Sequence, residues 1–314
     1  MTLAPVVLFV YNRPWHTHQT LDALSINIYA HQTVLYVYAD GAKPNASLED
    51  KNLISRTRNE ISKYIDSFKE VRLIKRSSNF GLASNLIDGI TNVLKHHDSV
   101  IVLEDDLVTI PYFLQYCNEG LQKYKNEQNV FSINGYQFPL GLDEHEVFLS
   151  PLATSSWGWA TWKDRWDQFL EVDEHDQHLL NSHTFLNNRF NFASYQYSAL
   201  LNSKNSWAIR WYYTAFMHNG LGVFPTRSLI INNGFDGSGV HCEEQNVPVQ
   251  MMATDKINVI KHKRINLKYE AALLDYFYEN LSTPSVLDKS KETRYVRKGF
   301  FSKLILKVFG RLKN

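Results

Sequence analysis

The sequence predicts an α/β fold in which a mixed, mostly parallel β-sheet is flanked by helices and followed by a helical C-terminal extension. The first observation behind this prediction is that short apolar runs, rich in Val, Ile, Leu and Tyr, alternate with longer segments of helical period. The second is that polar residues follow each of these runs. Strands that alternate with helices are typical of βαβ units, which build parallel sheets with helices on both faces.

Four apolar runs are the predicted strands, at residues 5–11, 34–39, 71–75 and 99–103. The predicted helices are the segments of helical period between them, at residues 16–29, 48–68 and 82–95. In a parallel sheet of this kind, ligands bind beyond the carboxyl ends of the strands. The residues directly after each strand are therefore the first candidates for a functional site.

Composition excludes several classes of protein. The 314 residues suffice for a substantial core, in one large domain or two small ones. Lys and Arg number 33 against 32 Asp and Glu, so no overall charge directs the chain to nucleic acid. Cys117 and Cys242 lack metal-site spacing and are too few to staple a secreted domain, which favours a reducing, cytoplasmic location. We expect neither a membrane span nor a secretory signal, because the chain shows no long apolar run and no basic leader.

Polar side chains follow all four predicted strands. They are Tyr11, Asn12 and Arg13 after the first strand, Asp40 after the second, Asn79 and Gly81 after the third, and Glu104, Asp105 and Asp106 after the fourth. A single polar strand end is usually a turn. Four such ends that meet at one edge of a sheet predict a binding site.

The first three strand ends each allow two interpretations. Arg13 can contact a phosphate, or it can lie on the surface ahead of Pro14 at the start of a helix. Asp40 can accept hydrogen bonds from a nucleotide base, or it can form an Asx-turn before Gly41. Asn79 can lie near an anion at the N-terminus of the next helix, or it can cap that helix. The residues alone leave each pair of alternatives open.

The three acids after the fourth strand suggest a cation site, with a solvated turn as the simpler alternative. If the strand continues through them, Glu104 and Asp106 point to one face of the sheet and Asp105 to the other. Mg²⁺ or Mn²⁺ is commonly held by one or two carboxylates together with substrate phosphates. Such an ion neutralises charge that develops on a phosphate leaving group. The acids therefore suggest metal-assisted group transfer from a nucleotide.

The order of these motifs resembles that of the GT-A glycosyltransferases, in particular the N-acetylglucosaminyltransferase I-like group and the bacterial family-2-like sugar transferases. The similar features are Asn12-Arg13, Asp40, NFGLASN (79–85) and VIVLEDDL (100–107), where EDD resembles the DxD metal motif. The likeness continues in SSWGWATWKDRW (155–166) and GLGVFPTRSLIINNGFDGSGVH (220–241). It spans roughly residues 4–241 and implies a GT-A (Rossmann-like) fold with a nucleotide-sugar site.

The resemblance implies a role for each matched position. The implied nucleotide-binding residues are Tyr11, Asn12, Arg13, Asp40, Asn79, Gly81 and Asp105. Among them, Asp40 would bind the base, a uracil, Arg13 the nucleotide or its phosphates, and Asp105 the ribose. Asp106 would coordinate the Mn²⁺ or Mg²⁺ that bridges the diphosphate. Glu104 would face the hydroxyls of the donor sugar. The sugar itself would lie over the family's Gly-Trp pair, which corresponds to Gly158 and Trp159.

Six of the seven tryptophans lie between residues 157 and 211. Tryptophan rings pack on the CH faces of sugars, and their N–H groups bind hydroxyls, so Trp157 and Trp159 are predicted to contact the donor sugar or the acceptor. The resemblance adds Gly158, between them, to this group. The alternative is core packing, because Trp159, Trp162 and Trp166 would share one face of a helix. We assign that core role to Trp162 and Trp166.

Transfer with inversion needs a carboxylate that accepts the proton of the acceptor hydroxyl. The family's Asp-Asp-Trp-type stretch corresponds to SWAIRWYY (206–213), which contains no acid. Asp164 and Asp167, near the tryptophans, and Asp236, in a Gly-rich loop, are the candidates, and each can instead be a surface or turn residue. His241, at the end of that loop, is a candidate contact for the diphosphate or the metal, with a structural role as the alternative.

The C-terminal segment has a different pattern. In residues 294–314 the apolar positions form one helical stripe, and Lys303, Lys307 and Arg311 lie opposite. This pattern is typical of a basic amphipathic helix on an anionic membrane surface, and a helix packed on the domain is the alternative. A cytoplasmic enzyme at the inner face of the membrane would meet lipid-linked sugars there.

The sequence therefore predicts a GT-A domain at residues 1–275, with a nucleotide-binding half (1–107) and a donor-sugar and acceptor half (108–275), and a basic amphipathic tail at 276–314. The predicted activity is metal-dependent transfer of a hexosyl or N-acetylhexosaminyl group from a nucleotide sugar to a glycan or lipid-linked oligosaccharide in surface polysaccharide synthesis. A sugar nucleotidylyltransferase would need a Gly-rich phosphate loop after the first strand, and FVYNRPWH (9–16) has no glycine. A non-catalytic carbohydrate-binding protein is the other alternative.

Overall fold

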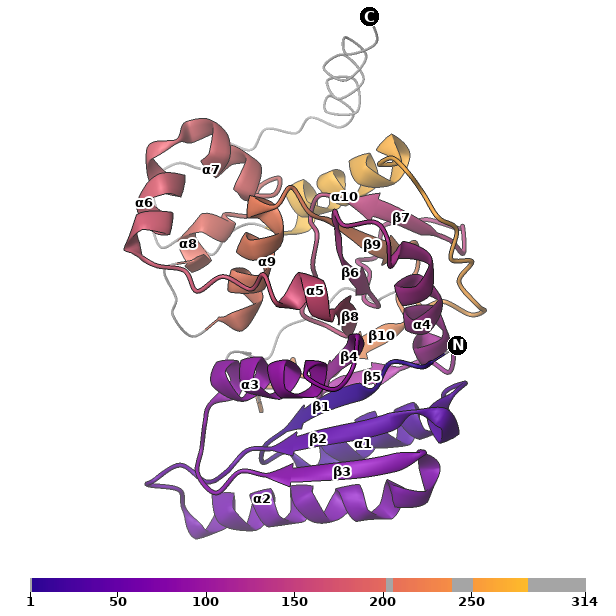
Figure 1. The fold of residues 1–314 in the computed structure, drawn as a ribbon, viewed down its shortest axis with the longest axis vertical. Coiled ribbons are helices and arrows are strands. Elements are labelled where there is room, and N and C mark those ends of the chain that lie inside the picture. Colours follow the sequence, from indigo (N-terminus) through magenta and orange to yellow (C-terminus); the bar gives the residue numbers. More distant parts are fainter. Residues whose placement is uncertain (1, 202–205, 239–250, 282–314) are drawn as a thin grey trace, which may run out of the picture.

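An eight-stranded β-sheet forms the centre of the protein, in the strand order β3-β2-β1-β4-β8-β6-β9-β7 (Figure 1). The structure, a computed structural model, describes residues 2–201, 206–238 and 251–281. Neighbouring strands are parallel from β3 to β4 and between β6 and β9, and antiparallel at the other three pairings. The predicted mixed, mostly parallel sheet flanked by helices is confirmed.

The first half of the chain builds the parallel part of this sheet. Its strands are β1 (Val6–Val10), β2 (Val34–Ala39), β3 (Glu70–Lys75) and β4 (Ser99–Glu104). They alternate with the helices α1 (Pro14–Ser25), α2 (Leu48–Ile61) and α3 (Leu82–Leu94). All four predicted strands and all three predicted helices are present. The first helix ends earlier than predicted, at Ser25, and the last part of the second is a 3₁₀ helix (Ser62–Ser67).

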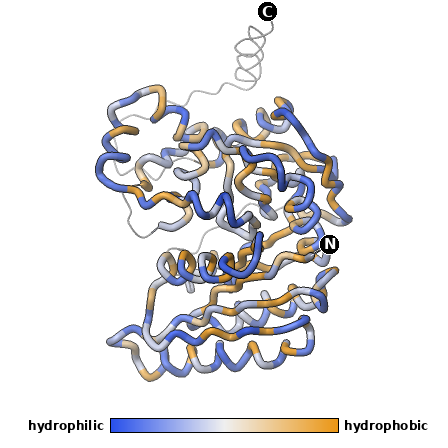
Figure 2. The backbone as a smooth tube through the Cα atoms, viewed as in Figure 1, coloured by the Kyte–Doolittle hydropathy of each residue, from blue (hydrophilic) through white to orange (hydrophobic). Residues whose placement is uncertain are grey.

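The local sequence explains where these helices begin. Pro14 occupies the first position of α1, where its missing N–H is not needed. Ser47 caps α2: its hydroxyl accepts a hydrogen bond from the Asp50 N–H at 3.0 Å, and the Asp50 carboxylate accepts one from the Ser47 N–H at 3.2 Å. Figure 2 shows hydrophobic colouring along the central strands and alternating hydrophilic and hydrophobic turns along α2. This pattern packs α1 and α2 on one face of the sheet and α3 on the other.

The second half adds the antiparallel strands and most of the helices. The strands of the large sheet are β6 (Val130–Asn134), β7 (Val147–Ser150), β8 (Trp159–Trp162) and β9 (Leu221–Pro225). A separate two-stranded antiparallel sheet joins β5 (Leu107–Thr109) to β10 (Ile230–Asn232). The helices are α4 (Phe113–Tyr124), α5 (Lys163–Trp166), α6 (Glu174–Ser182), α7 (Thr184–Phe190), α8 (Tyr197–Leu201), α9 (Trp207–Met217) and α10 (Leu267–Asn280).

The tryptophan-rich segment forms a strand, so the helical face considered for Trp159, Trp162 and Trp166 is absent. Residues three apart on a strand point to opposite faces. Trp159 accordingly packs among the rings of Trp207 and Trp211 on one side of the sheet. Trp162 packs on the other side, where its indole N–H donates to the Leu121 carbonyl at 3.0 Å. Trp162 and Trp166 are both buried, and their core role is confirmed.

The helix α10 runs through the predicted boundary between residues 275 and 276, so that boundary does not separate two structural units. Its buried residues belong to the same core cluster as the large sheet, and the Tyr269 ring lies 5.4 Å from that of Phe148 in β7. The basic segment at 294–314 lies outside the described residues. Within the described ranges, no helix is long and apolar enough to cross a lipid bilayer.

Candidate functional site

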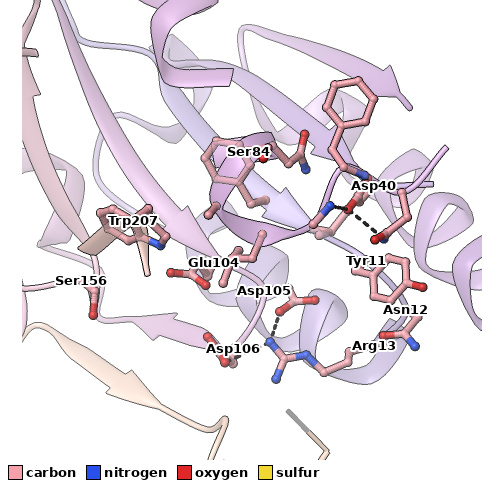
Figure 3. A pocket seen from close by; sticks show the side chains of 18 of the residues that line it. Tyr11, Asn12, Arg13, Asp40, Ser84, Glu104, Asp105, Asp106, Ser156 and Trp207 are labelled. Atoms are coloured by element: carbon pink, nitrogen blue, oxygen red, sulfur yellow. Dashed lines mark hydrogen bonds and ion pairs between the residues drawn. The ribbon is translucent and has the colours of Figure 1, made fainter. Parts of the chain in front are cut away.

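A pocket of about 590 Å³ opens at the carboxyl edge of the parallel strands. The predicted residues that line it come from all four strand ends: Tyr11, Asn12, Arg13, Asp40, Asn79, Gly81, Glu104, Asp105 and Asp106. Trp157 lines it as well. Figure 3 shows Asp40, Tyr11 and Asn12 at one end of the pocket, Trp207 and Ser156 at the other, and the acids between them. The four strand ends therefore meet at one site, as their positions in the sequence predicted.

The three acids lie where β4 turns into β5: Glu104 is the last residue of the strand, and Asp105 and Asp106 form the turn. The strand thus ends before both aspartates, so the condition under which alternation would set the directions of all three acids is not met. All three line the same pocket instead of facing opposite sides of the sheet. We call residues Glu104, Asp105 and Asp106 the acid turn. Because the strand has ended, alternation no longer sets the direction of the two aspartates.

Backbone contacts hold the acid turn in place. The hydroxyl of Thr20 in α1 donates a hydrogen bond to the Asp105 carbonyl at 2.8 Å. The Asn233 N–H donates to the Asp106 carbonyl at 2.9 Å. A Cβ atom at Gly234 would collide with the Asp106 carboxylate, so the absence of a side chain there lets the loop after β10 pass close to that carboxylate. The turn is thus fixed from both sides of the pocket.

Arg13 forms ion pairs with both aspartates of the turn. Its Nη2 atom contacts Asp105 Oδ1 and lies 3.0 Å from Asp106 Oδ2. Burial opposes the charge of Arg13, but the attraction of Asp105 and Asp106 outweighs it and raises the pKa of this guanidinium. Arg13 therefore keeps its charge. The alternative that it lies on the surface is wrong, because its side chain is only 17% exposed.

Burial sets the protonation of the neighbouring carboxyl groups. Burial, together with the like charges of Asp106 and Asp105, raises the pKa of Glu104 to about 8. Burial also raises the pKa of Asp105, against the attraction of Arg13. A carboxyl group with a pKa near 8 is mostly protonated at neutral pH and can donate a hydrogen bond. Glu104 can therefore donate to a hydroxyl oxygen as well as accept from it.

The donor atoms of the pocket suit a hard divalent cation. Such ions bind carboxylate oxygens and complete their coordination with water or substrate phosphates. The side chains of the acid turn are not close enough together to form a ready metal cluster. Among the described residues, such a cluster, with its ligand atoms within 4.8 Å of one another, is formed by Asp173, His175 and Asp176. The two aspartates of that group serve the N-terminus of α6, since Asp173 accepts from the Asp176 N–H at 2.9 Å and Asp176 accepts from the Asp173 N–H at 3.1 Å. The acid turn fits a metal that a substrate helps to bind.

Asp40 organises the loop that follows β3. Its Oδ1 accepts hydrogen bonds from the N–H groups of Gly41 and Phe80, both at 2.8 Å. Its Oδ2 accepts from the Asn79 side chain and the Gly81 N–H, both at 3.0 Å. The contact to Gly41 reaches only the next residue, so it is not the predicted Asx-turn, which needs the N–H two residues on. Asn79 bonds to Asp40 rather than capping α3, whose cap is Gly81. A carboxylate accepts about four hydrogen bonds, so these donors use the capacity of Asp40.

Aromatic side chains form the other end of the pocket. The Trp157 ring packs edge-on against Tyr136 at 4.5 Å and against Phe235 at 5.6 Å. Gly158 has a φ of 67°, in the left-handed region, and this turn directs Trp157 to the pocket and Trp159 to the core. Trp159 has no exposed surface, so its predicted sugar contact is wrong. Trp207 lines the pocket in its place and stacks on Trp159 at 5.6 Å.

Two of the three predicted base candidates lie at the wrong edge of the sheet. The antiparallel pairing of β4 with β8 puts Trp162 opposite Ser99, at the amino end of β4, and α5 begins one residue later. Five residues of strand, about 17 Å, separate that end from Glu104. Asp164 pairs with Arg165 at 2.7 Å and Asp167 with Lys163 at 2.5 Å on the protein surface. Neither carboxylate can act in the pocket, so the prediction of Asp164 or Asp167 as the catalytic base is wrong.

Asp236 lies near the pocket, between two residues that line it, Phe235 and Ser238. Its Oδ1 accepts hydrogen bonds from the Ser238 N–H at 3.0 Å and hydroxyl at 2.6 Å, and its Oδ2 lies 3.1 Å from His16 Nε2. The bonds from Ser238 lower the pKa of Asp236. His241, predicted in the same loop, lies outside the described residues.

Other pocket residues were not predicted. They are Phe9, Val10, Lys43, Phe80, Leu82, Ala83, Ser84, Asn85, Ser156, Trp207, Ala208, Asn232, Phe235 and Ser238. Several of them lie inside the quoted motifs, in NFGLASN and in the segment 220–241. The sequence therefore identified these motifs but only some of their residues that line the pocket. Trp207 and Ala208 lie in SWAIRWYY (206–213), which was searched only for an acid, so its tryptophan was not considered as a pocket residue.

Comparisons with known proteins gave structural likeness only. No protein-family model matches the chain, and no curated protein matches its sequence. The structure of S. aureus TarS 1-349 in complex with UDP aligns with a TM-score of 0.42 and 10% identity over 73% of this chain and 59% of that one. GalNAc-T7 with UDP, GalNAc and Mn²⁺ aligns with a TM-score of 0.41 and 10% identity over 71% and 42% of the two chains. UDP-glucose pyrophosphorylase complexed with UDP-glucose gives a TM-score of 0.33, with 11% identity over 71% and 90%. The chain thus spans well under two thirds of the length of the first two.

Proposed function

We propose that this protein is a GT-A glycosyltransferase that moves a hexosyl or N-acetylhexosaminyl group from a UDP-sugar to a glycan or lipid-linked oligosaccharide. The observation that carries the proposal is the single pocket with two chemically different ends and an acid turn between them (Figure 3). One end offers Tyr11, Asp40 and the loop at Asn79, which suit a nucleoside. The other offers Trp157 and Trp207, aromatic faces of the kind that pack on sugar rings.

The charge of the pocket supports a requirement for Mn²⁺ or Mg²⁺. Its lining includes four carboxyl groups, at Asp40, Glu104, Asp105 and Asp106. Two basic groups accompany them, at Arg13 and Lys43. With Glu104 mostly protonated, the three aspartates still outnumber the two basic groups, so a diphosphate would be repelled and a divalent ion would relieve that repulsion. Asp106 would hold the ion together with phosphate oxygens, and the ion would neutralise the charge that develops on the departing UDP.

The chain's own residues then have separate tasks. Arg13 would bind the phosphates, Asp105 the ribose, and the loop that Asp40 fixes would bind the uracil through its backbone and Asn79. Glu104, mostly protonated at neutral pH, would hydrogen-bond to donor-sugar hydroxyls. Trp157, turned into the pocket at Gly158, would support the sugar ring.

The residue that accepts the acceptor's proton in an inverting reaction would come from the loop after β10. Asp236 is the remaining candidate, and it lies beside the pocket. Its lowered pKa makes it a weak base in the described arrangement, so it would first have to give up the hydrogen bonds from Ser238. Asp236→Asn should reduce turnover strongly and leave UDP binding unchanged if this assignment is correct.

The test of the activity is calorimetry with UDP in the presence and absence of Mn²⁺, followed by turnover with a panel of UDP-sugars. We expect metal-dependent UDP binding that Asp106→Asn abolishes. Asp164→Asn is the matched control, because it removes an exposed acid at the opposite edge of the sheet. A carbohydrate-binding protein would ignore UDP and Mn²⁺. A nucleotidylyltransferase would form UTP from UDP-sugar and pyrophosphate, and this product would contradict the proposal.

We also propose that the enzyme works in the cytoplasm, peripherally bound to the inner face of the membrane, in surface polysaccharide synthesis. The support is the basic amphipathic pattern of residues 294–314. Deleting residues 299–314 should release the protein from anionic vesicles and lower turnover on lipid-linked acceptors. Unchanged vesicle binding after the deletion would refute the membrane assignment.

A further inference from the structure

A single nitrogen atom lies between the two aspartates of the acid turn. Arg13 Nη2 contacts Asp105 Oδ1 and lies 3.0 Å from Asp106 Oδ2. In a bidentate arginine–carboxylate pair, by contrast, two guanidinium nitrogens would bind the two oxygens of one carboxylate. A metal ion that Asp106 holds, with Asp105 beside it, would take the place that Nη2 occupies. We call it the inter-aspartate position. In the described structure a positive charge of the chain itself occupies it.

The surroundings leave the Arg13 side chain as the part that can move. The backbone of the acid turn is held by the Thr20 hydroxyl and by the Asn233 N–H. The backbone of Arg13 is held as well, because its carbonyl accepts the first hydrogen bond of α1, from the Thr17 N–H at 3.0 Å. The other basic groups nearby have other positions: His16 contacts Asp236, and Lys43 forms no ion pair with the acid turn among the described residues.

The energetic consequence depends on which ligand arrives. A free divalent ion that displaced Arg13 would leave a guanidinium that is 17% exposed without its partners and next to a second positive charge. A metal that arrives with a diphosphate would supply phosphate oxygens, with which a guanidinium forms strong charge-assisted hydrogen bonds. The exchange is therefore unfavourable for the ion alone and favourable for the ion with the nucleotide.

We propose that Arg13 is an internal counter-ion that occupies the inter-aspartate position until a metal–nucleotide complex replaces it, so that free divalent ions bind weakly and metal and nucleotide bind together. The proposal rests on the proposed metal-dependent nucleotide site and adds the order in which that site fills. In this scheme Arg13 moves from the aspartates to the phosphates. By linkage, the factor by which UDP strengthens Mn²⁺ binding equals the factor by which Mn²⁺ strengthens UDP binding.

The test measures free Mn²⁺ by electron paramagnetic resonance during titration of the full chain, first without and then with UDP. Removing the internal cation with Arg13→Met should strengthen binding of Mn²⁺ alone by about 5- to 150-fold, the usual range of a coupling between sites. The same variant should bind UDP in the presence of Mn²⁺ more weakly than the wild type, because the phosphates lose a partner. The control is Lys43→Met, which removes a positive charge from the pocket without vacating the inter-aspartate position and should change Mn²⁺ binding far less.

The outcomes separate this proposal from the proposed function. If Arg13→Met binds Mn²⁺ alone no more tightly than the wild type or Lys43→Met does, Arg13 is not the counter-ion. If the wild type fails to bind UDP with Mn²⁺, the proposed function is wrong, whatever the Arg13 result. Thermal unfolding verifies that each variant is folded, and Arg13→Gln, with a polar head in place of the charge, gives the same measurement if Arg13→Met does not fold. Methylguanidinium, added as a substitute for the missing side chain, should weaken the binding of Mn²⁺ alone to Arg13→Met toward the wild-type level.

Discussion

Glu270 should make the protein less stable as the pH rises from about 4.5 to about 7. This residue lies on the buried face of α10 and is 7% exposed, and its Oε2 has no hydrogen-bond partner among the described residues. Burial raises the pKa of Glu270 from 4.5 to about 7, and a hydrogen bond with Ser150 offsets part of this effect. The carboxyl group is therefore held in its neutral form by an apolar environment.

The sign and size of the effect follow from linkage. Below pH 4.5 the folded and unfolded chains both keep the proton, so no stability is lost. Between pH 4.5 and 7 the unfolded chain releases its proton first, so the free energy of unfolding falls as the pH rises, and the loss is complete above pH 7. At about 1.4 kcal/mol per pKa unit, the full loss is about 3 kcal/mol, of which about 2–3 kcal/mol falls between pH 5 and pH 8.

The assay is urea unfolding of the wild type and of Glu270→Gln at pH 5 and pH 8. The amide has no proton to lose, so the variant should gain about 2–3 kcal/mol relative to the wild type between the two pH values. Glu279→Gln, at an exposed position of the same helix, is the control and should show no such gain. If the two variants respond equally to pH, Glu270 does not carry a buried proton and our account of α10 is wrong.

Three further substitutions test the pocket. Asp40→Asn replaces an acceptor of four hydrogen bonds by a group with one acceptor oxygen, so it should destabilise the protein by about 1–3 kcal/mol and weaken UDP binding, whereas the exposed Asp66→Asn should do neither. Gly234→Ala adds a Cβ that collides with the Asp106 carboxylate; calorimetry should show weaker Mn²⁺-dependent UDP binding, and unchanged binding would mean that the loop yields without effect. Trp157→Ala should lower kcat/KM for the UDP-sugar without changing the Kd for UDP, and an equal loss of UDP affinity would place the sugar elsewhere.

The first half of the chain was predictable because its signals are local. The run 34–39 is β2 from end to end, and the other three strands differ from prediction by one residue or so at their ends. The rule that parallel strands present their carboxyl ends at one edge then brought Arg13, Asp40 and Asp106 together without any knowledge of contacts.

The second half was less predictable because its signals are long-range. Tryptophans at residues 159, 162 and 166 fit a helical face as well as a short strand, and the choice of strand depends on pairing with β4 and β6, which the local sequence does not encode. Once β8 is antiparallel to β4, the residues that follow it lie at the amino edge, so Asp164 and Asp167 cannot reach the pocket. Sequence proximity to Trp157 was therefore a poor guide to spatial proximity.

The pairing of Arg13 with both aspartates also lay beyond sequence reasoning. The ends of β1 and β4 are neighbours because these strands pair in register, with Phe9 opposite Glu104. The alternation rule assigned separate directions to Asp105 and Asp106, but it applies only inside a strand, and β4 ends at Glu104, before both aspartates. Strand ends are the least certain part of any such prediction, and the proposed metal site lies at one of them.

The small sheet of β5 and β10 fixes the distance between the acid turn and the loop after β10. This distance does not depend on the length of most of the chain that connects the two strands. Leu107 pairs with Asn232, so the residues just after the acid turn are tied directly to those just before Gly234, Phe235 and Asp236. Insertions or replacements within α6, α7 and α8 would lengthen the path along the chain without changing this distance. That region can therefore diverge in size and shape while the geometry at the acid turn stays constant.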